Sequence, residues 1–233
     1  MIPALSAQMM NGLGGGDPGW IPEGAVAHLN FIGGNYFAGG QSRTVDTILG
    51  GAFLPVSIDP SMGMYVDNTS PNRPNAIGPL FDDIAAGLAA GCTVVFEIQF
   101  QDDPYGSFIH LMDAAGANAA TEWVSGTIFG GAAYVQDQED IELSAGAGSL
   151  TTAGLHKIAF TFARRADGDF EYAVSSDGSV AETMTVDYAP LSPVNTITLF
   201  HDGDDTSILD DAWVHSITLY PAVAPAGLPA LTA

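Results

Sequence analysis

Cysteine and basic residues are scarce in this sequence, and each shortage excludes a class of protein. Cys92 is the only cysteine, so neither an internal disulfide nor a zinc cluster of several thiolates can form. We expect this thiol to be buried and inert. Five Lys and Arg stand against 27 Asp and Glu, which gives a formal net charge of −22. Because such a charge repels phosphate backbones and anionic lipids, we expect neither nucleic acid nor membrane as a partner.

Long apolar runs are also missing. No run reaches the roughly 18 apolar residues that span a bilayer. Residues 1–5 show no basic segment leading into an apolar one, so we expect no signal peptide. Apolar residues nevertheless make up 47% of the 233 residues and charged residues only 14%, which favours a sizeable core over disorder.

The chain divides into a Gly/Pro-rich N-terminal arm, residues 1–24, and a β-rich domain, residues 25–233. In 93–100 the apolar residues alternate with polar ones, and this period of two is typical of a half-buried strand. One helix is predicted over 79–90, where apolar residues recur at helical spacing. Many short strands with turn signals between them indicate an all-β antiparallel sandwich or barrel. Further strands are predicted at 26–31, 44–49, 62–66, 108–112, 127–129, 133–136, 141–143, 157–163, 169–175, 196–200 and 212–220.

Three segments in a fixed order resemble laminin-G-like domains. Residues 155–162 resemble the strand that usually reads W-H-H-V-A-L-T-Y, and 168–178 resemble the v-x-L-Y-V-D-G hairpin. Residues 209–221 resemble the closing strand I-D-D-V-R-I-Y, and 226–233 resemble the tail that often follows it. The resemblance covers roughly 92–233. It implies a concanavalin A-like jelly-roll sandwich.

The upstream part, with Ala27–Phe31 and a helix leading into 93–100, is similar to virion proteins of tailed bacteriophages that carry such jelly rolls. This similarity implies a non-enzymatic structural protein of the virion, a capsid decoration or spike. Its partners would be other virion proteins or copies of itself, in a homo-oligomer assembled through the arm and the sheet surfaces. Likeness of fold does not by itself establish function.

A glycan-binding adhesion module of a tail or fibre is the alternative reading, with a cell-surface glycan as partner. Trp123 and Tyr134 lie in or near predicted loops, where an aromatic ring can stack on a sugar. Core packing is the competing interpretation of an aromatic residue in a strand. We expect structural roles for the five histidines, which show no metal-binding spacing.

A glycoside hydrolase is the third reading. Retaining glycosidases need two carboxyl groups about 5–5.5 Å apart, which related sandwiches supply from an E-x-D-x-x-E strand. The nearest segment here is 138–142, and in an extended strand Glu139 would face away from Asp140 and Glu142. We therefore predict no catalytic residues and no enzymatic activity.

One cluster of carboxylates is dense enough to hold calcium. The ion takes six to eight oxygen ligands, and an Asp/Gly loop can supply several of them. Asp and Gly are also the ordinary residues of a β-turn, so a turn without metal is the competing interpretation. No cofactor is otherwise expected. The candidate calcium ligands are Asp202, Asp204, Asp205 and Asp210.

Overall fold

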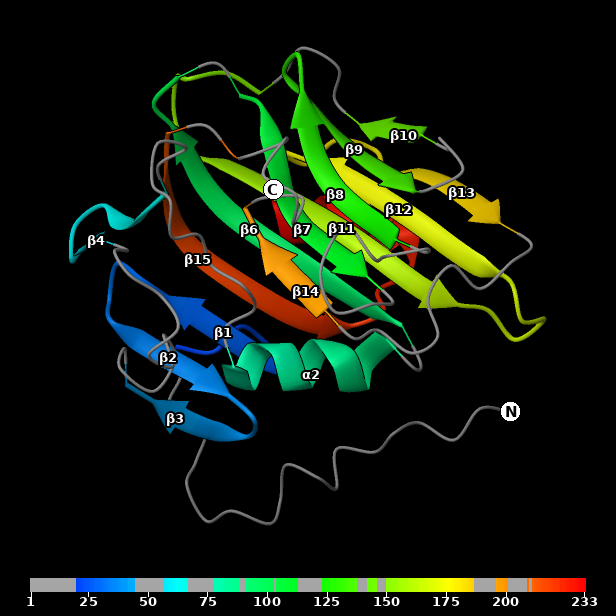
Figure 1. Cartoon of the computed structure of the whole chain (residues 1–233), viewed down its shortest axis with the longest axis horizontal. Helices are drawn as coiled ribbons and strands as arrows, with labels where there is room; N and C mark the ends of the chain where they lie inside the picture. The colour runs from blue at the N-terminus through cyan, green and yellow to red at the C-terminus, as the bar shows by residue number, and fades with distance from the viewer. Residues whose placement is uncertain are drawn as a thin grey trace.

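The computed structural model describes residues 20–44, 57–66, 78–88, 91–102, 104–112, 123–137, 142–145, 150–186, 196–200, 209 and 211–233. Within these residues the chain forms two antiparallel sheets, and Figure 1 shows the smaller sheet in front of the larger one. This arrangement is an antiparallel β-sandwich, as the sequence predicts. The arm at 1–19 and the predicted strand at 45–49 lie outside the described residues.

Eight described strands of the larger sheet follow the order β13-β12-β11-β6-β15-β1-β2-β3. Two more strands, β4 and β5, join it because β5 pairs with the first residues of β15. The strands are β1 (Ala27–Asn30), β2 (Asn35–Ala38), β3 (Gln41–Arg43), β4 (Ser57–Asp59), β5 (Gly63–Val66), β6 (Cys92–Phe100), β11 (His156–Arg164), β12 (Phe170–Ser176), β13 (Glu182–Val186) and β15 (Ala212–Pro221).

The smaller sheet has five described strands, in the order β10-β9-β8-β7-β14. Its central strands β7 and β8 pair in an antiparallel register that contains one irregularity, between Ser107 and Ile109. The strands are β7 (Gly106–Met112), β8 (Trp123–Phe129), β9 (Ala132–Asp137), β10 (Glu142–Ala145) and β14 (Thr196–Leu199).

The core lies between the sheets and is built on phenylalanine. Phe96 of β6 is fully buried, and its ring centroid lies 5.1 Å from that of Phe108 on β7 and 6.1 Å from that of Phe160 on β11. Gly126 of β8 faces the same cluster, where an added Cβ would meet the Phe160 ring at 2.7 Å. The glycine thus lets the two sheets approach at this point.

Strand β15 differs from its predicted pattern. The alternation predicts Trp213, His215, Ile217 and Leu219 on one side, but the pairing with β6 shifts register between Val214 and Ser216. A β-bulge of this kind exchanges the two faces of the strand. Trp213 is therefore only partly buried, on the outer face, with its ring 4.9 Å from that of Tyr65. The apolar side chains that β15 buries are Ala212, Val214, Ile217 and Leu219.

Helix α2 (Gly78–Leu88) confirms the predicted helix and lies beside the sandwich in Figure 1. Its Leu80, Ile84 and Leu88 are buried in the core at helical spacing. A 3-10 turn, η3 (Pro225–Gly227), and a five-residue helix, α3 (Leu228–Thr232), follow β15. No helix among the described residues is long and apolar enough to cross a membrane.

The C-terminal segment covers part of the outer face of the larger sheet. Leu228 of α3 is fully buried against Val95, Ala159 and Ala173, which come from three adjacent strands. Thr232 is also buried, and its hydroxyl lies 3.0 Å from the Ser175 hydroxyl. This face of the larger sheet is therefore closed where α3 sits, whereas the smaller sheet carries a depression on its outer side.

Candidate functional site

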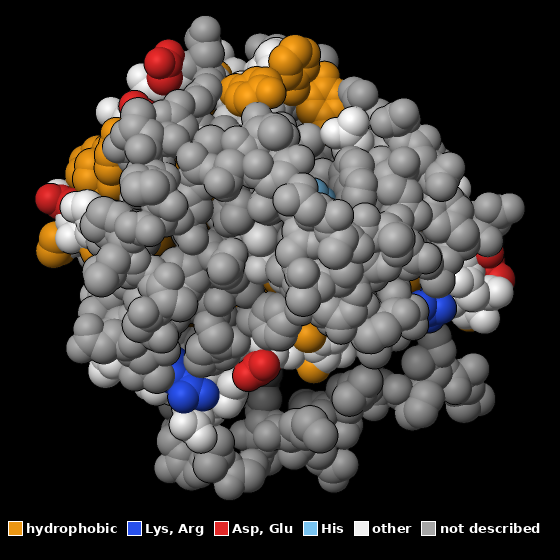
Figure 2. Space-filling model, in the orientation of Figure 1, with side chains coloured by type: hydrophobic (Ala, Val, Ile, Leu, Met, Phe, Trp, Pro, Cys, Tyr) orange, Lys and Arg blue, Asp and Glu red, His pale blue; other side chains and the backbone are white. Residues whose placement is uncertain are grey.

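A depression of about 220 Å³ lies at the end of the smaller sheet where β8 turns into β9. Figure 2 shows hydrophobic side chains gathered at the upper edge of the molecule, over the end of β8. The volume is below the roughly 300–1,000 Å³ of pockets that hold drug-sized ligands, so the depression can hold only a small ligand. The lining residues are Tyr105, Gly106, Thr127, Ile128, Phe129, Tyr134 and Gln136.

Two exposed aromatic rings dominate this depression. The Phe129 side chain is 62% exposed and that of Tyr105 is 39% exposed. Their ring centroids are 5.8 Å apart, and the rings meet edge to face. Burying adjacent aromatic rings would be favourable, so this pair of exposed rings is a candidate binding surface.

A tight turn explains why Phe129 is exposed. Gly130 and Gly131 both have positive φ, 57° and 78°, as a two-residue type I′ hairpin requires. The turn pairs Phe129 with Ala132, whose small side chain leaves the phenyl ring open to solvent on this side of the hairpin. A Phe-Gly-Gly-Ala sequence therefore presents an aromatic residue at the tip of two rigid strands.

Polar groups of neighbouring strands complete the lining. Tyr134 of β9 lies directly opposite Thr127 of β8, and Gln136 lies two residues further along the same face. The Thr127 hydroxyl donates a hydrogen bond of 2.8 Å to the Gly106 carbonyl oxygen, which ties the start of β7 to β8. Because β9 is a regular strand, the side chains of Tyr134 and Gln136 leave it on the same face.

The described residues of this lining supply groups that can bind a ligand: aromatic rings, an amide and hydroxyl groups. An amide offers both a donor and an acceptor, and a phenol does the same. The depression can hold a small ligand that is apolar on one face and carries hydroxyl groups at its edges.

The sequence found one of these residues and missed two others. Tyr134, a predicted glycan ligand, is half-buried and lines the depression. Trp123, the other predicted ligand, begins β8, but its side chain lies outside the described residues. Tyr105 and Phe129 were not predicted. The Gly-Gly pair after Phe129 was the available signal, because it marks a hairpin tip, where a large apolar residue is unusual.

The predicted calcium ligands Asp202, Asp204, Asp205 and Asp210 all lie outside the described residues, so the calcium site stays a prediction. Among the residues that the structure describes, no group of three or more His, Cys, Asp or Glu is placed to hold a metal ion. The acidic segment 138–141 also lies outside them.

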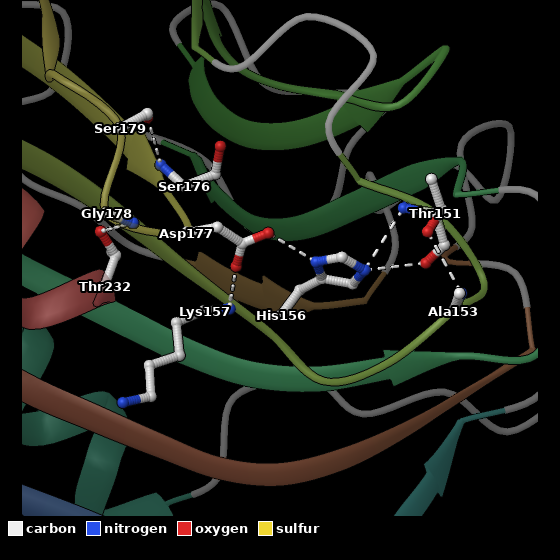
Figure 3. A network of polar contacts seen from close by, with 9 residues as sticks. All are labelled: Thr151, Ala153, His156, Lys157, Ser176, Asp177, Gly178, Ser179 and Thr232. Carbon is white, nitrogen blue, oxygen red and sulfur yellow. Dashed lines mark hydrogen bonds and ion pairs between the residues drawn. The ribbon is translucent and has the colours of Figure 1, made fainter.

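His156, which begins β11, has a structural role (Figure 3). It is buried; its Nδ1 lies 2.6 Å from Oδ2 of Asp177, and its Nε2 lies 2.9 Å from the Thr151 carbonyl oxygen. The other carboxylate oxygen of Asp177 accepts a 2.9 Å hydrogen bond from the Lys157 backbone N–H. Because both ring nitrogens have hydrogen-bond partners, His156 links the loop at Thr151 to the hairpin turn at Asp177.

Two other histidines and the cysteine have shifted pKa values. Burial lowers the pKa of His28 and His215 below the ordinary value near 6.5, and the nearby Glu97 carboxylate opposes this shift. His28 is held by the Thr218 hydroxyl, 2.8 Å from its Nδ1. Burial raises the pKa of Cys92 to about 12, which confirms the prediction of a buried, inert thiol.

No family model and no curated protein matches the sequence. Several solved structures match the fold. The Trypanosoma rangeli sialidase has a TM-score of 0.55 and 11% identity, with 89% of this chain and 32% of that chain covered. The leech intramolecular trans-sialidase has a TM-score of 0.52 and 14% identity, with 72% and 27% covered. The Ruminococcus gnavus sialidase CBM40 domain has a TM-score of 0.47 and 12% identity, with 66% and 88% covered.

These likenesses concern the fold. At identities of 11% and 14%, these two sialidases share the sandwich with this chain, which spans 32% of the length of the first and 27% of that of the second. The architecture, a β-sandwich of antiparallel sheets with one helix of more than two turns among the described residues, is the concanavalin A-like class that the sequence predicts.

Proposed function

We propose that this protein is a saccharide-binding module and that the depression lined by Tyr105, Phe129 and Tyr134 is its binding site. The observation that carries the proposal is the pair of solvent-exposed aromatic rings, Tyr105 and Phe129, in a depression that the Gln136 amide also lines. A sugar ring presents an apolar C–H face that can stack on an aromatic side chain, while its hydroxyl groups hydrogen-bond to amides and phenols.

The solved structures with the same sandwich support a saccharide as the class of ligand. One structure of the T. rangeli sialidase is a complex with 2,3-difluorosialic acid, and the leech trans-sialidase is complexed with 2,7-anhydro-Neu5Ac. Both ligands are sugar derivatives. The activity of the sialidases is not carried over to this chain, since likeness of fold does not establish function. We infer a module that binds its ligand without transforming it.

This proposal favours the glycan-binding reading of the sequence over the virion-assembly reading. No contact or surface described above favours assembly with other virion proteins or with copies of the same chain. A place on a bacteriophage particle, and a homo-oligomer built through the arm, remain predictions from sequence resemblance.

The test is binding of the full chain to a glycan array that carries neutral and sialylated glycans. Phe129→Ala and Tyr134→Ala should each weaken binding about tenfold or more, as truncation of an aromatic residue at the centre of a site does. Val180→Ala is the matched control, because Val180 is 82% exposed and does not line the depression.

All three variants should keep the thermal unfolding midpoint of the parent chain, since surface substitutions change stability little. The proposal fails if the parent chain binds no glycan. It also fails if Val180→Ala weakens binding as much as Phe129→Ala does.

A further inference from the structure

We infer that the site selects neutral saccharides and discriminates against sialylated ones, an inference that rests on the proposed function. The charge around the depression carries it. Among the residues that the structure describes, those that line the depression include no Lys, Arg or His. A carboxylate bound at a protein surface is normally held by a cation, above all by the two parallel N–H groups of an arginine. The lining offers a sugar carboxylate no such partner.

The described basic residues lie elsewhere and are already engaged. Arg165 contacts Asp167 at 3.3 Å and Glu171 at 3.7 Å, and the Lys157 ammonium donates to the Ala233 carbonyl oxygen at 2.9 Å. The other two described basic residues belong to the larger sheet as well: Arg43 of β3 donates to the Ala38 carbonyl oxygen, and Arg164 of β11 packs over the Phe170 ring.

Figure 2 agrees with this distribution. Basic side chains are visible at the lower left and at the right, away from the hydrophobic group at the upper edge. If a sialylated sugar stacked on the aromatic rings, its carboxylate would therefore lose hydration without gaining an ion pair. Burying a charged group under those conditions is unfavourable.

The charge of the whole chain acts in the same direction. With 27 acidic and five basic residues, the net charge of −22 produces a negative potential around the molecule. That potential lowers the local concentration of anionic glycans and leaves neutral glycans unaffected. Salt shortens its range, from about 30 Å at 0.01 M to about 3 Å at 1 M. Discrimination should therefore be strongest at low ionic strength.

The available polar groups suit a neutral sugar. The Gln136 amide can donate to one hydroxyl and accept from another, and the Tyr134 phenol can do the same. Each hydroxyl group of a pyranose can both donate and accept a hydrogen bond, so groups that play both roles match it. The site thus differs in charge preference from the sialidases whose sandwich it shares.

The experiment compares matched glycan pairs, lactose with 3′-sialyllactose and N-acetyllactosamine with its sialylated form, as immobilised probes. Binding of the full chain is measured at about 20 mM and about 500 mM NaCl, on either side of the screening range. We expect each neutral member to bind about tenfold or more tightly than its sialylated partner at low salt. The difference should shrink at high salt because only the sialylated member gains affinity.

A single substitution tests whether the lack of a cation in the described lining determines the selectivity. Gln136→Arg places a guanidinium in the lining and should bring the sialylated probe to within about threefold of the neutral one; Gln136→Glu is the matched control and should widen the difference. Thermal unfolding verifies that both variants are folded.

The outcomes separate the two proposals. Equal or tighter binding of the sialylated probe, lost in Phe129→Ala, overturns the neutral preference and leaves the saccharide site standing. An unchanged difference in Gln136→Arg also overturns the inference, because the missing cation would then not determine selectivity. If no neutral or sialylated glycan binds, both the site and its preference are wrong.

Discussion

His156 and Asp177 form a hydrogen-bonded pair, 2.6 Å apart, between the start of β11 and the turn that follows β12. Asp177 has a positive φ of 46°, and Gly178, the next residue, has a φ of 71°, so the turn is of the type I′ kind. This left-handed conformation is tolerated by Asp better than by most residues. It is the conformation in which the carboxylate reaches both the imidazole and the Lys157 N–H.

Asp177→Ala should lower the free energy of unfolding by about 1.5–3 kcal/mol, the range for hydrogen bonds to a charged group. The substitution removes the partner of a buried histidine and leaves alanine in a left-handed conformation. Urea unfolding measures the effect. Asp177→Gly should cost less, because glycine relieves the backbone strain and loses only the carboxylate.

Asp167→Ala is the control for this pair, since Asp167 also lies in a hairpin turn but binds the exposed Arg165. Exposed pairs contribute about 0–1 kcal/mol, so the change should be small. An Asp177→Ala variant no less stable than Asp167→Ala would contradict the structural role given to His156.

Gly126→Ala should destabilise the sandwich by about 1–3 kcal/mol, as overpacking of a core does. The added methyl would meet the Phe160 ring at 2.7 Å, and that ring is fully buried. Combining Gly126→Ala with Phe160→Leu should cost less than the sum of the two changes, because the smaller side chain makes room. Strict additivity in the double-mutant cycle would mean that the two residues do not touch.

Stability should fall as the pH decreases below the ordinary histidine value of about 6.5. Burial lowers the pKa of His28 and His215 in the folded chain, so the unfolded chain takes up protons first. The contribution of these residues is therefore complete above pH 6.5 and decreases as the pH drops toward their folded values. Glu97 reduces the effect, since its carboxylate favours the protonated imidazoles.

The measurement is urea unfolding between about pH 8 and about pH 5. His28→Gln and His215→Gln should each flatten the dependence, because glutamine does not titrate. The same slope in the double variant and in the parent chain would show that other groups control the acid response.

Alternation predicted the central strands well. In β6 the side chains of Val94, Phe96, Ile98 and Phe100 are buried, and Glu97 and Gln99 are partly exposed on the opposite face, as a period of two requires. Helix α2 was predictable for the same reason, because its buried apolar residues recur at helical spacing. These elements are long enough for burial on one face to leave a clear pattern in the sequence.

The rest depended on pairing partners that a sequence does not reveal. The bulge in β15 exchanges faces within one strand, so Trp213 was expected in the core and lies outside it. Strands β2 and β3 are four and three residues long and are separated by two glycines, so their alternation is too brief to detect. Tyr105 and Phe129 are 24 positions apart and meet only because β7 pairs with β8.

The bulge in β15 also separates two hairpins, β1–β2 and β4–β5, that both pair with this strand. On one edge of this strand, β5 pairs with 212–214 and β1 pairs with 216–219, and the irregular residue His215 lies between the two stretches. Each hairpin therefore sets its own alignment against the long strand. An insertion or deletion in the β4–β5 hairpin need not displace the β1–β2 hairpin, so the two can vary in length independently while the central sheet keeps its geometry.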